Sequence, residues 1–259
     1  MKIEDYLNSK KIIVNENGFV KKQYAKNYND IDRQIQIIVN CQQLIIGEKS
    51  TIIPRVNSFI GKEFEGYKVD LKKVKEIMPE LEEKSNNNEY RYFISEEAKR
   101  IMDRAERTIK SMDMKLYYKL IKRSMDNYEI CLGRVDEGNL KINDDGYFVI
   151  RTIKYISYNL IEHDCYSYIK RIKRRILGID AQKIITMYAG LACLEDDSIR
   201  YLDILANYPF EEMKILIKYR NDNTMNTDEG WAEDILKAKI IDGKELLWEE
   251  QNVWIKIDM

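Results

Sequence analysis

This 259-residue sequence is poor in histidine, proline and glycine, with one, three and eleven of these residues respectively. The single imidazole, on His163, excludes histidine-rich metal sites and leaves one histidine at most for a Ser-His-Asp or Cys-His catalytic group. The scarcity of proline and glycine excludes collagen-like and linker-type composition. We therefore expect a folded protein whose chemistry does not depend on histidine.

Cysteine is sparse as well, and its four residues are scattered at positions 41, 131, 165 and 193. No C-x-x-C pair is present, which excludes a zinc ribbon and a thioredoxin-like dithiol. Such cysteines are typical of buried, reduced thiols. No window approaches 18 consecutive apolar residues, so we expect no membrane-spanning helix. Acidic residues close to Met1 predict synthesis in the cytoplasm without a signal peptide.

Neither sign of charge dominates, because the chain has 43 Lys and Arg residues and 44 Asp and Glu residues, which gives a formal net charge of −1. We therefore expect no nucleic-acid partner. Charged residues make up 34% and apolar residues 44% of the chain, which excludes intrinsic disorder. The densest basic run is 170–175, and the apolar residues interleaved with it predict a helix whose basic side chains face water. A docking surface for an acidic partner is the alternative for this run.

The first ninety residues mix strand and helix signals. Residues 10–14 and 19–24 flank an Asn-Gly turn and predict a hairpin. Isoleucines at helical spacing predict a helix over about 30–46. We also expect an extended segment over 51–60, a helix over 62–84 that Pro79 ends or kinks, and a surface connection between two lobes at 85–88.

The remainder is predicted to be mainly helical with one hairpin. Ser95 is the expected cap of a helix whose apolar stripe runs from Ala98 to Met112. Residues 140–142 and 147–150 flank a turn that ends in Gly146, and they predict a strand pair. Further helices are expected near residues 162–177, 181–193, 196–207, 210–220 and 228–241.

The segment 130–140 has the most informative pattern. An apolar strand is followed by Gly133, Arg134, four spacers and Asn139, and then by a short hairpin. This is the layout of a kinase catalytic loop, in which an aspartate accepts the proton of the substrate and an asparagine five residues later holds a metal ion. Here the chain resembles the aminoglycoside-phosphotransferase and choline-kinase superfamily, and more narrowly the CotS-type spore coat proteins of endospore-forming bacteria.

The resemblance covers about residues 95–245. It includes 117–121 before the loop, the loop and its hairpin, 155–164 after it, and 208–210 with Trp231 in the C-terminal helices. By this resemblance, His163 and Asp164 match the family's structural aspartate region, and we predict a capping role for His163 rather than a catalytic one. Near the N-terminus, Phe19, Val20, Lys21 and Lys22 resemble the strand that bears a phosphate-binding lysine, without a glycine-rich loop beside it.

Two departures from the family pattern decide what the resemblance implies. Active members read His-Gly-Asp in the loop, whereas this chain has Leu132, Gly133 and Arg134 and keeps Asn139. Active members end the next strand in a metal-binding aspartate, whereas this chain has Arg151 there. A guanidinium has five donors and no acceptor, so it neither takes a proton nor ligates magnesium. At an effective dielectric constant of about 20, a divalent cation about 5 Å from one guanidinium is repelled by roughly 6–7 kcal/mol.

We therefore predict an α+β protein of the protein-kinase-like, two-lobe type, with a reduced N-terminal lobe over 1–90 and a mainly helical C-terminal lobe over 91–259. By the resemblance we expect a non-catalytic pseudokinase, without cofactor or metal. It would act as a structural or interaction protein in the spore coat or its assembly, with other coat proteins as partners. We expect neither a membrane nor nucleic acid as a partner, and the oligomeric state stays open.

Two alternatives remain. A small-molecule phosphotransferase of the aminoglycoside or choline type would need another carboxylate, and Asp136, two residues beyond Arg134, is the available one. A binding module would hold an anionic ligand between Arg134 and Arg151, with a lysine of the 19–22 strand reaching the same pocket. The plainer interpretation pairs the two arginines with Asp136, Glu137 or other nearby acidic residues, and it gives Asn139 a hydrogen-bonding role inside the loop.

Overall fold

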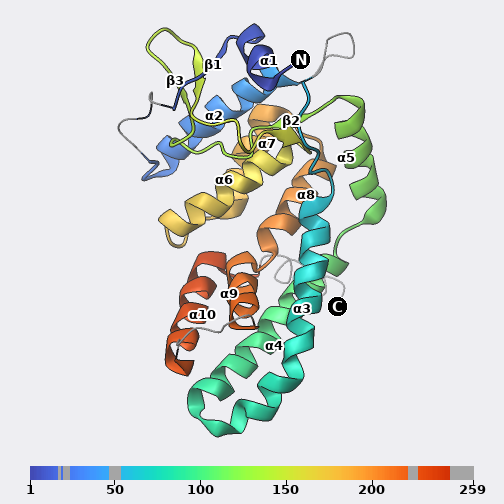
Figure 1. Ribbon diagram of the computed structural model, residues 1–259, viewed down its shortest axis with the longest axis vertical. Coiled ribbons are helices and arrows are strands. Elements are labelled where there is room, and N and C mark those ends of the chain that lie inside the picture. The colour runs from blue at the N-terminus through green and yellow to red at the C-terminus, as the bar shows by residue number, and fades with distance from the viewer. Residues whose placement is uncertain (17–18, 20–23, 47–53, 221–226, 246–259) are drawn as a thin grey trace, which may run out of the picture. The chain divides into compact units, whose positions relative to one another are not determined.

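The computed structural model describes residues 1–16, 19, 24–46, 54–220 and 227–245. It confirms the α+β class, because the structure is mostly helical with a few short strands (Figure 1). The chain divides into two compact units, Met1–Gly61 with Met114–Ala206 and Lys62–Asp113 with Asn207–Met259. The expected division at residue 90 does not coincide with these units, since residue 90 lies inside the second one.

The first unit alternates helices with short strands. Its elements are α1 (Ile3–Ser9), β1 (Ile12–Val14), α2 (Tyr28–Ile45), α5 (Met114–Asp126), β2 (Ile130–Cys131), β3 (Leu140–Ile142), β4 (Phe148–Ile150), β5 (Ser157–Tyr158), α6 (Glu162–Arg175), α7 (Ala181–Ala192) and all but the last residue of α8 (Asp196–Asn207). The helices expected near 30–46, 162–177, 181–193 and 196–207 are confirmed. The sequence did not predict α1 or α5.

Two small sheets form in the first unit. β3 and β4 pair antiparallel, with Leu140 opposite Ile150, and Gly146 in the turn between them has φ +81°. The Tyr147 N–H donates to the Asn143 side chain at 2.8 Å, so the predicted strand pair and its turn are confirmed. β4 also pairs in parallel with β1, and β2 pairs antiparallel with β5.

The described part of the N-terminal segment differs from the predicted hairpin. β1 forms inside the expected strand 10–14, and its partner is β4. The Asn-Gly turn and residues 20–23, which include Lys21 and Lys22, lie outside the described residues. Of the expected extended segment, 51–53 also lies outside them, and a later part runs beside β5, where the Phe59 N–H donates to the Tyr158 carbonyl at 2.9 Å.

Helix α2 supplies much of the core of the first unit. Its N-cap, Asn27, accepts a hydrogen bond from the Asp30 N–H at 3.0 Å. Ile31, Ile35 and Ile38 lie on one face and are fully buried or nearly so. This face packs against α6, α7 and the strands β2 and β3. Burying each isoleucine stabilises the fold by about 1.5–3 kcal/mol.

The second unit is built from helices that pack in pairs. It contains α3 (Lys62–Lys84), the 3₁₀ turn η2 (Ser85–Asn87), α4 (Glu89–Lys110), α9 (Phe210–Arg220) and α10 (Asp228–Asp242). The helices expected near 62–84, 210–220 and 228–241 are confirmed. α3 packs along α4, and α9 packs against α10. Tyr67 of α3 stacks on Tyr208, with ring centroids 3.7 Å apart, and ties the two pairs together.

α3 spans the predicted residues 62–84 and continues through Pro79, so Pro79 does not end it. Two capping predictions are wrong. α4 begins at Glu89, because Asn88 caps it by accepting the Arg91 N–H at 2.8 Å, and Ser95 is therefore a buried residue inside the helix. The N-cap of α6 is Ile161, and His163 lies within the first turn of that helix, so His163 is not its cap.

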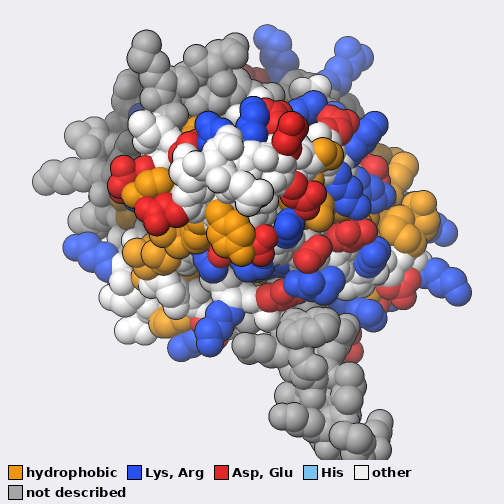
Figure 2. All heavy atoms as spheres, turned by 90° about the horizontal axis from the view of Figure 1, so that it is seen from below, with side chains coloured by type: hydrophobic (Ala, Val, Ile, Leu, Met, Phe, Trp, Pro, Cys, Tyr) orange, Lys and Arg blue, Asp and Glu red, His pale blue; other side chains and the backbone are white. Residues whose placement is uncertain are grey.

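Side chains of both charge signs are interspersed on the face drawn in Figure 2. Cys41, Cys131 and Cys165 are buried free thiols, as predicted, whereas Cys193 is exposed at the C-terminal end of α7. Across the described ranges, no helix combines the length and the apolar character that crossing a bilayer requires.

Candidate functional site

Asp164 of α6 holds the start of the loop 132–139 that links β2 to β3. Its fully buried carboxylate accepts hydrogen bonds from the Leu132 N–H at 3.0 Å and the Gly133 N–H at 2.7 Å. Gln42 of α2 donates a third at 3.1 Å. Burial raises the pKa of Asp164 to about 6, although the three hydrogen bonds oppose this rise. The carboxylate therefore acts as an internal clamp on the loop.

Gly133 has a backbone conformation that favours glycine. Its φ is +66°, and a Cβ at this position would lie 2.5 Å from the Tyr155 carbonyl oxygen. The Ser167 hydroxyl donates to the Gly133 carbonyl at 2.9 Å. The loop thus passes closely between α6 and the residues just before β5, where a side chain would not fit.

Both polar atoms of the Asn139 amide form hydrogen bonds inside the protein. Its Nδ2 donates to the Arg134 carbonyl at 2.6 Å, and its Oδ1 accepts the Thr152 N–H at 3.1 Å. The Arg151 N–H donates to the Asn139 carbonyl at 2.8 Å. The structure therefore brings together the backbones of three predicted site residues, Arg134, Asn139 and Arg151, and gives Asn139 the predicted role within the loop.

Asp136 lies at the centre of an arginine cluster. Its fully buried carboxylate is 2.8 Å from Arg175 Nη2, 3.4 Å from Arg171 Nη1 and 3.8 Å from Arg134 Nε. The predicted pairing of Arg134 with a nearby acidic residue is therefore present. The prediction that the basic run of α6 faces water is wrong for Arg171 and Arg175, because this buried carboxylate draws them inward.

Glu137 extends the cluster toward α6. It accepts hydrogen bonds from the Tyr168 hydroxyl at 2.8 Å and from Arg175 Nη1 at 3.0 Å. The guanidinium of Arg175 also stacks 3.8 Å from the centre of the Tyr24 ring. The sequence analysis named Glu137 as a possible partner of an arginine and missed Tyr168 and Tyr24 as site residues. Tyr168, Arg171 and Arg175 recur at intervals of three and four along α6, which is the signal that places them on one helix face.

The side chain of Arg151 takes no part in the arginine cluster. Arg151 directly follows β4, and within the described ranges no hydrogen bond or ion pair joins its guanidinium to Asp136 or Glu137. Of the two arginines predicted to hold an anion between them, Arg134 is therefore directed to Asp136. Its other predicted members, Lys21 and Lys22, lie outside the described residues.

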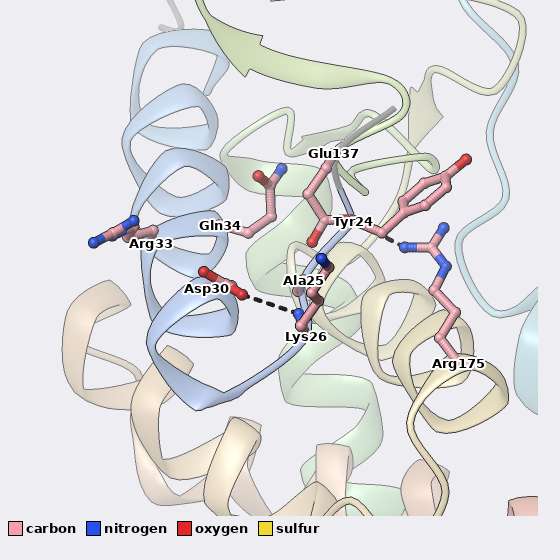
Figure 3. Close-up of a pocket in the computed structure, with 8 residues that line it drawn as sticks. All are labelled: Tyr24, Ala25, Lys26, Asp30, Arg33, Gln34, Glu137 and Arg175. Atoms are coloured by element: carbon pink, nitrogen blue, oxygen red, sulfur yellow. Dashed lines mark hydrogen bonds and ion pairs between the residues drawn. The ribbon is translucent and has the colours of Figure 1, made fainter. Parts of the chain in front are cut away.

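A cavity of about 720 Å³ lies beside the loop (Figure 3). Its lining residues are Tyr24, Ala25, Lys26, Asp30, Arg33, Gln34, Glu137 and Arg175. Figure 3 shows Gln34 and Glu137 directed into it from α2 and from the loop. Gln34 Nε2 donates to the carbonyls of Val135 and Leu140 at 2.8 and 3.1 Å, so α2 supports the loop from this side. The volume is in the range of small-molecule sites.

No metal-binding constellation is evident in the described part of the chain, where His, Cys, Asp and Glu form no group of three or more that could hold an ion. No family model and no curated protein matches the chain. A proposal for its function depends, then, on the contacts of the loop and α6 and on the resemblance of the sequence.

Proposed function

We propose that this chain is a non-catalytic pseudokinase that acts as a structural or interaction protein. The main support is the state of the loop 132–139, in which Arg134 forms an ion pair and Asn139 forms hydrogen bonds inside the protein. Arg134 faces Asp136, and Asn139 binds the backbone on both sides of its amide. These contacts support a role for the two side chains in holding the loop together.

The chemistry of the reaction makes the same point. Phosphoryl transfer needs an acceptor for the proton of the substrate hydroxyl and oxygen ligands for Mg²⁺. Arg134 and Arg151 offer neither, and the remaining Asn139 amide oxygen, which also accepts the Thr152 N–H, is a single neutral ligand. Asp136 is a poor substitute base, because it is fully buried and three guanidiniums lie within 4 Å of it.

The path of the backbone supports the kinase-like part of the proposal. The loop follows a short strand, a hairpin follows the loop, and the hairpin ends beside Asn139. A buried aspartate, Asp164, holds the start of the loop from the next helix. This is the arrangement that the resemblance implies, and we extend it to a two-lobe, protein-kinase-like fold with a reduced N-terminal lobe.

Thermal unfolding with ATP and MgCl₂ tests the proposal. We expect no rise in melting temperature and no phosphoryl transfer to an aminoglycoside or to choline. The double variant Arg134→Asp with Arg151→Asp is expected to remain without turnover, because it lacks a glycine-rich phosphate loop. Metal-dependent stabilisation of the wild type, or turnover that Asp136→Asn abolishes, would show that the chain is an enzyme.

The resemblance also assigns this protein to the spore coat or its assembly, with other coat proteins as partners. Fractionation of spores from the source bacterium tests this assignment, and we expect the chain in the coat extract. Recovery from vegetative cells alone, with none in spores, would contradict it.

A further inference from the structure

The arginine cluster around Asp136 carries more positive charge than its carboxylates balance. Arg175 engages both acids, at 2.8 Å from Asp136 and 3.0 Å from Glu137. Arg134 and Arg171 have only longer contacts, 3.8 and 3.4 Å, with the Asp136 carboxylate that they share. Within the described residues, the cluster therefore has three guanidiniums for two carboxylates.

Arg134 and Arg171 also keep donors that the protein does not use. Among the described residues, the buried Nε atoms of both arginines have no hydrogen-bond partner, and neither has the buried Oδ1 of Asp136. Their side chains are 27% and 29% exposed, so solvent reaches part of each. Burial lowers the pKa of Arg171, and repulsion by Arg134 and Arg175 adds to this while Asp136 opposes it. Two cations are thus held close together at the surface without full compensation.

We propose that Arg134 and Arg171 jointly bind a phosphate or phosphoryl group, without a metal ion. Each guanidinium presents a planar fork of donors, and a tetrahedral oxyanion has enough oxygens to accept from both forks. The anion would neutralise the surplus charge, and Asp136 keeps the two arginines in place when the site is empty. This inference rests on the proposed function in one respect, since the loop holds a phosphoryl group and does not transfer it.

The site differs from the two other candidates near the loop. It uses Arg171 in place of Arg151, because the structure directs Arg134 and Arg171 to the same carboxylate. It also differs from the cavity of Figure 3, whose exposed arginine is Arg33 of α2. These differences provide matched variants for the test.

Titration with potassium phosphate, against potassium chloride at equal ionic strength and with EDTA present, tests the site by calorimetry and thermal unfolding. We expect saturable binding and a higher melting temperature for the wild type. Arg134→Gln and Arg171→Gln should each weaken binding about tenfold or more, because a charged hydrogen bond contributes about 1.5–3 kcal/mol. Arg171→Lys keeps the positive charge and loses the planar set of guanidinium donors, so it should also bind phosphate more weakly. It replaces Arg171→Gln in the test if that variant misfolds.

Arg33→Gln is the matched control and should bind phosphate as the wild type does. Absence of phosphate binding by the wild type would overturn the proposed site. Phosphate binding that survives Arg134→Gln and Arg171→Gln but is lost in Arg33→Gln would overturn it as well. If a phosphoserine peptide competes with phosphate, the site is supported and its ligand is the phosphoryl group of a phosphorylated partner. If phosphate binds and the peptide does not compete, the site is supported and its ligand is a small phosphate ion. Metal-dependent nucleotide turnover together with intact phosphate binding would contradict the pseudokinase proposal alone.

Discussion

Asp164 illustrates how burial sets the behaviour of a single residue in this protein. Its carboxylate is fully buried, and two backbone N–H groups and the Gln42 amide donate to it. Neutral donors stabilise the anion less than water and counter-ions do, so the pKa of Asp164 rises to about 6. The clamp on the loop is therefore also a group whose protonation changes near neutral pH.

The sign of the resulting pH dependence follows from linkage. Because the folded-state pKa of Asp164 lies above the unfolded value of 3.8, the folded protein binds more protons between about pH 4 and pH 6. The contribution of Asp164 to the free energy of unfolding therefore falls as pH rises through this window. Between pH 5 and pH 7 the loss is about 1 kcal/mol.

Asp164→Asn isolates this contribution, because the amide does not titrate. At pH 7 the variant should be less stable by about 1–3 kcal/mol, since its NH₂ group faces a backbone N–H that loses its acceptor. Urea unfolding of both proteins should show the wild-type advantage shrinking by about 1 kcal/mol from pH 5 to pH 7. A constant advantage, or one that grows with pH, would contradict the raised pKa.

At the scale of elements, the two turns beside the site make different demands on glycine. Gly133 and Gly146 both have positive φ, +66° and +81°. A Cβ on Gly133 would collide with the Tyr155 carbonyl, whereas a Cβ on Gly146 would meet nothing within 4 Å. The loop glycine is therefore constrained by its neighbours, and the hairpin glycine by its backbone alone.

Substituting each glycine by alanine measures the difference. Gly146→Ala should cost about 1–2 kcal/mol, the penalty for left-handed backbone in a residue with a Cβ. Gly133→Ala should cost distinctly more, because the backbone must also move away from Tyr155. Equal losses in denaturant unfolding would show that the close approach at Gly133 has no energetic weight.

The elements also show which sequence signals are reliable. α2 and the helices from α6 to α8 follow apolar periodicity, and the hairpin of β3 and β4 follows its turn residues. The capping predictions for Ser95 and His163 fail, because Asn88 and Ile161 stand closer to the true starts of those helices. Ile161 is apolar and forms no side-chain cap, so a polar residue near a helix start does not by itself mark the cap.

At the scale of the whole molecule, each unit has its own core, and Arg104 anchors that of the second. Arg104 is 3% exposed and donates to the carbonyls of Asn207, Gly243 and Lys244 at 2.9, 2.6 and 3.3 Å. It also lies 3.8 Å from the fully buried Glu212. One side chain thus links α4 to the beginning and the end of the α9–α10 pair.

Arg104→Met should destabilise the second unit by about 3–5 kcal/mol, the usual cost of removing one partner from a buried ionic network. Hydrogen exchange should become faster in α3, α4, α9 and α10, with little change in α2, β3 and β4. Arg107→Met, one turn away on α4, is the control, because Arg107 is 43% exposed and its pair with Glu245 contributes about 1 kcal/mol or less. Equal acceleration of exchange in both units would show that they unfold together.

Most of the helices and the hairpin of β3 and β4 could be predicted from the sequence, because each depends on residues a few positions apart. Tertiary structure alone decided the parallel pairing of β1 with β4, the grouping of the chain into its two units and the inward turn of Arg171 and Arg175 toward Asp136. These features depend on which distant surfaces meet and on the need of a buried carboxylate for positive partners, and no local spacing encodes either one.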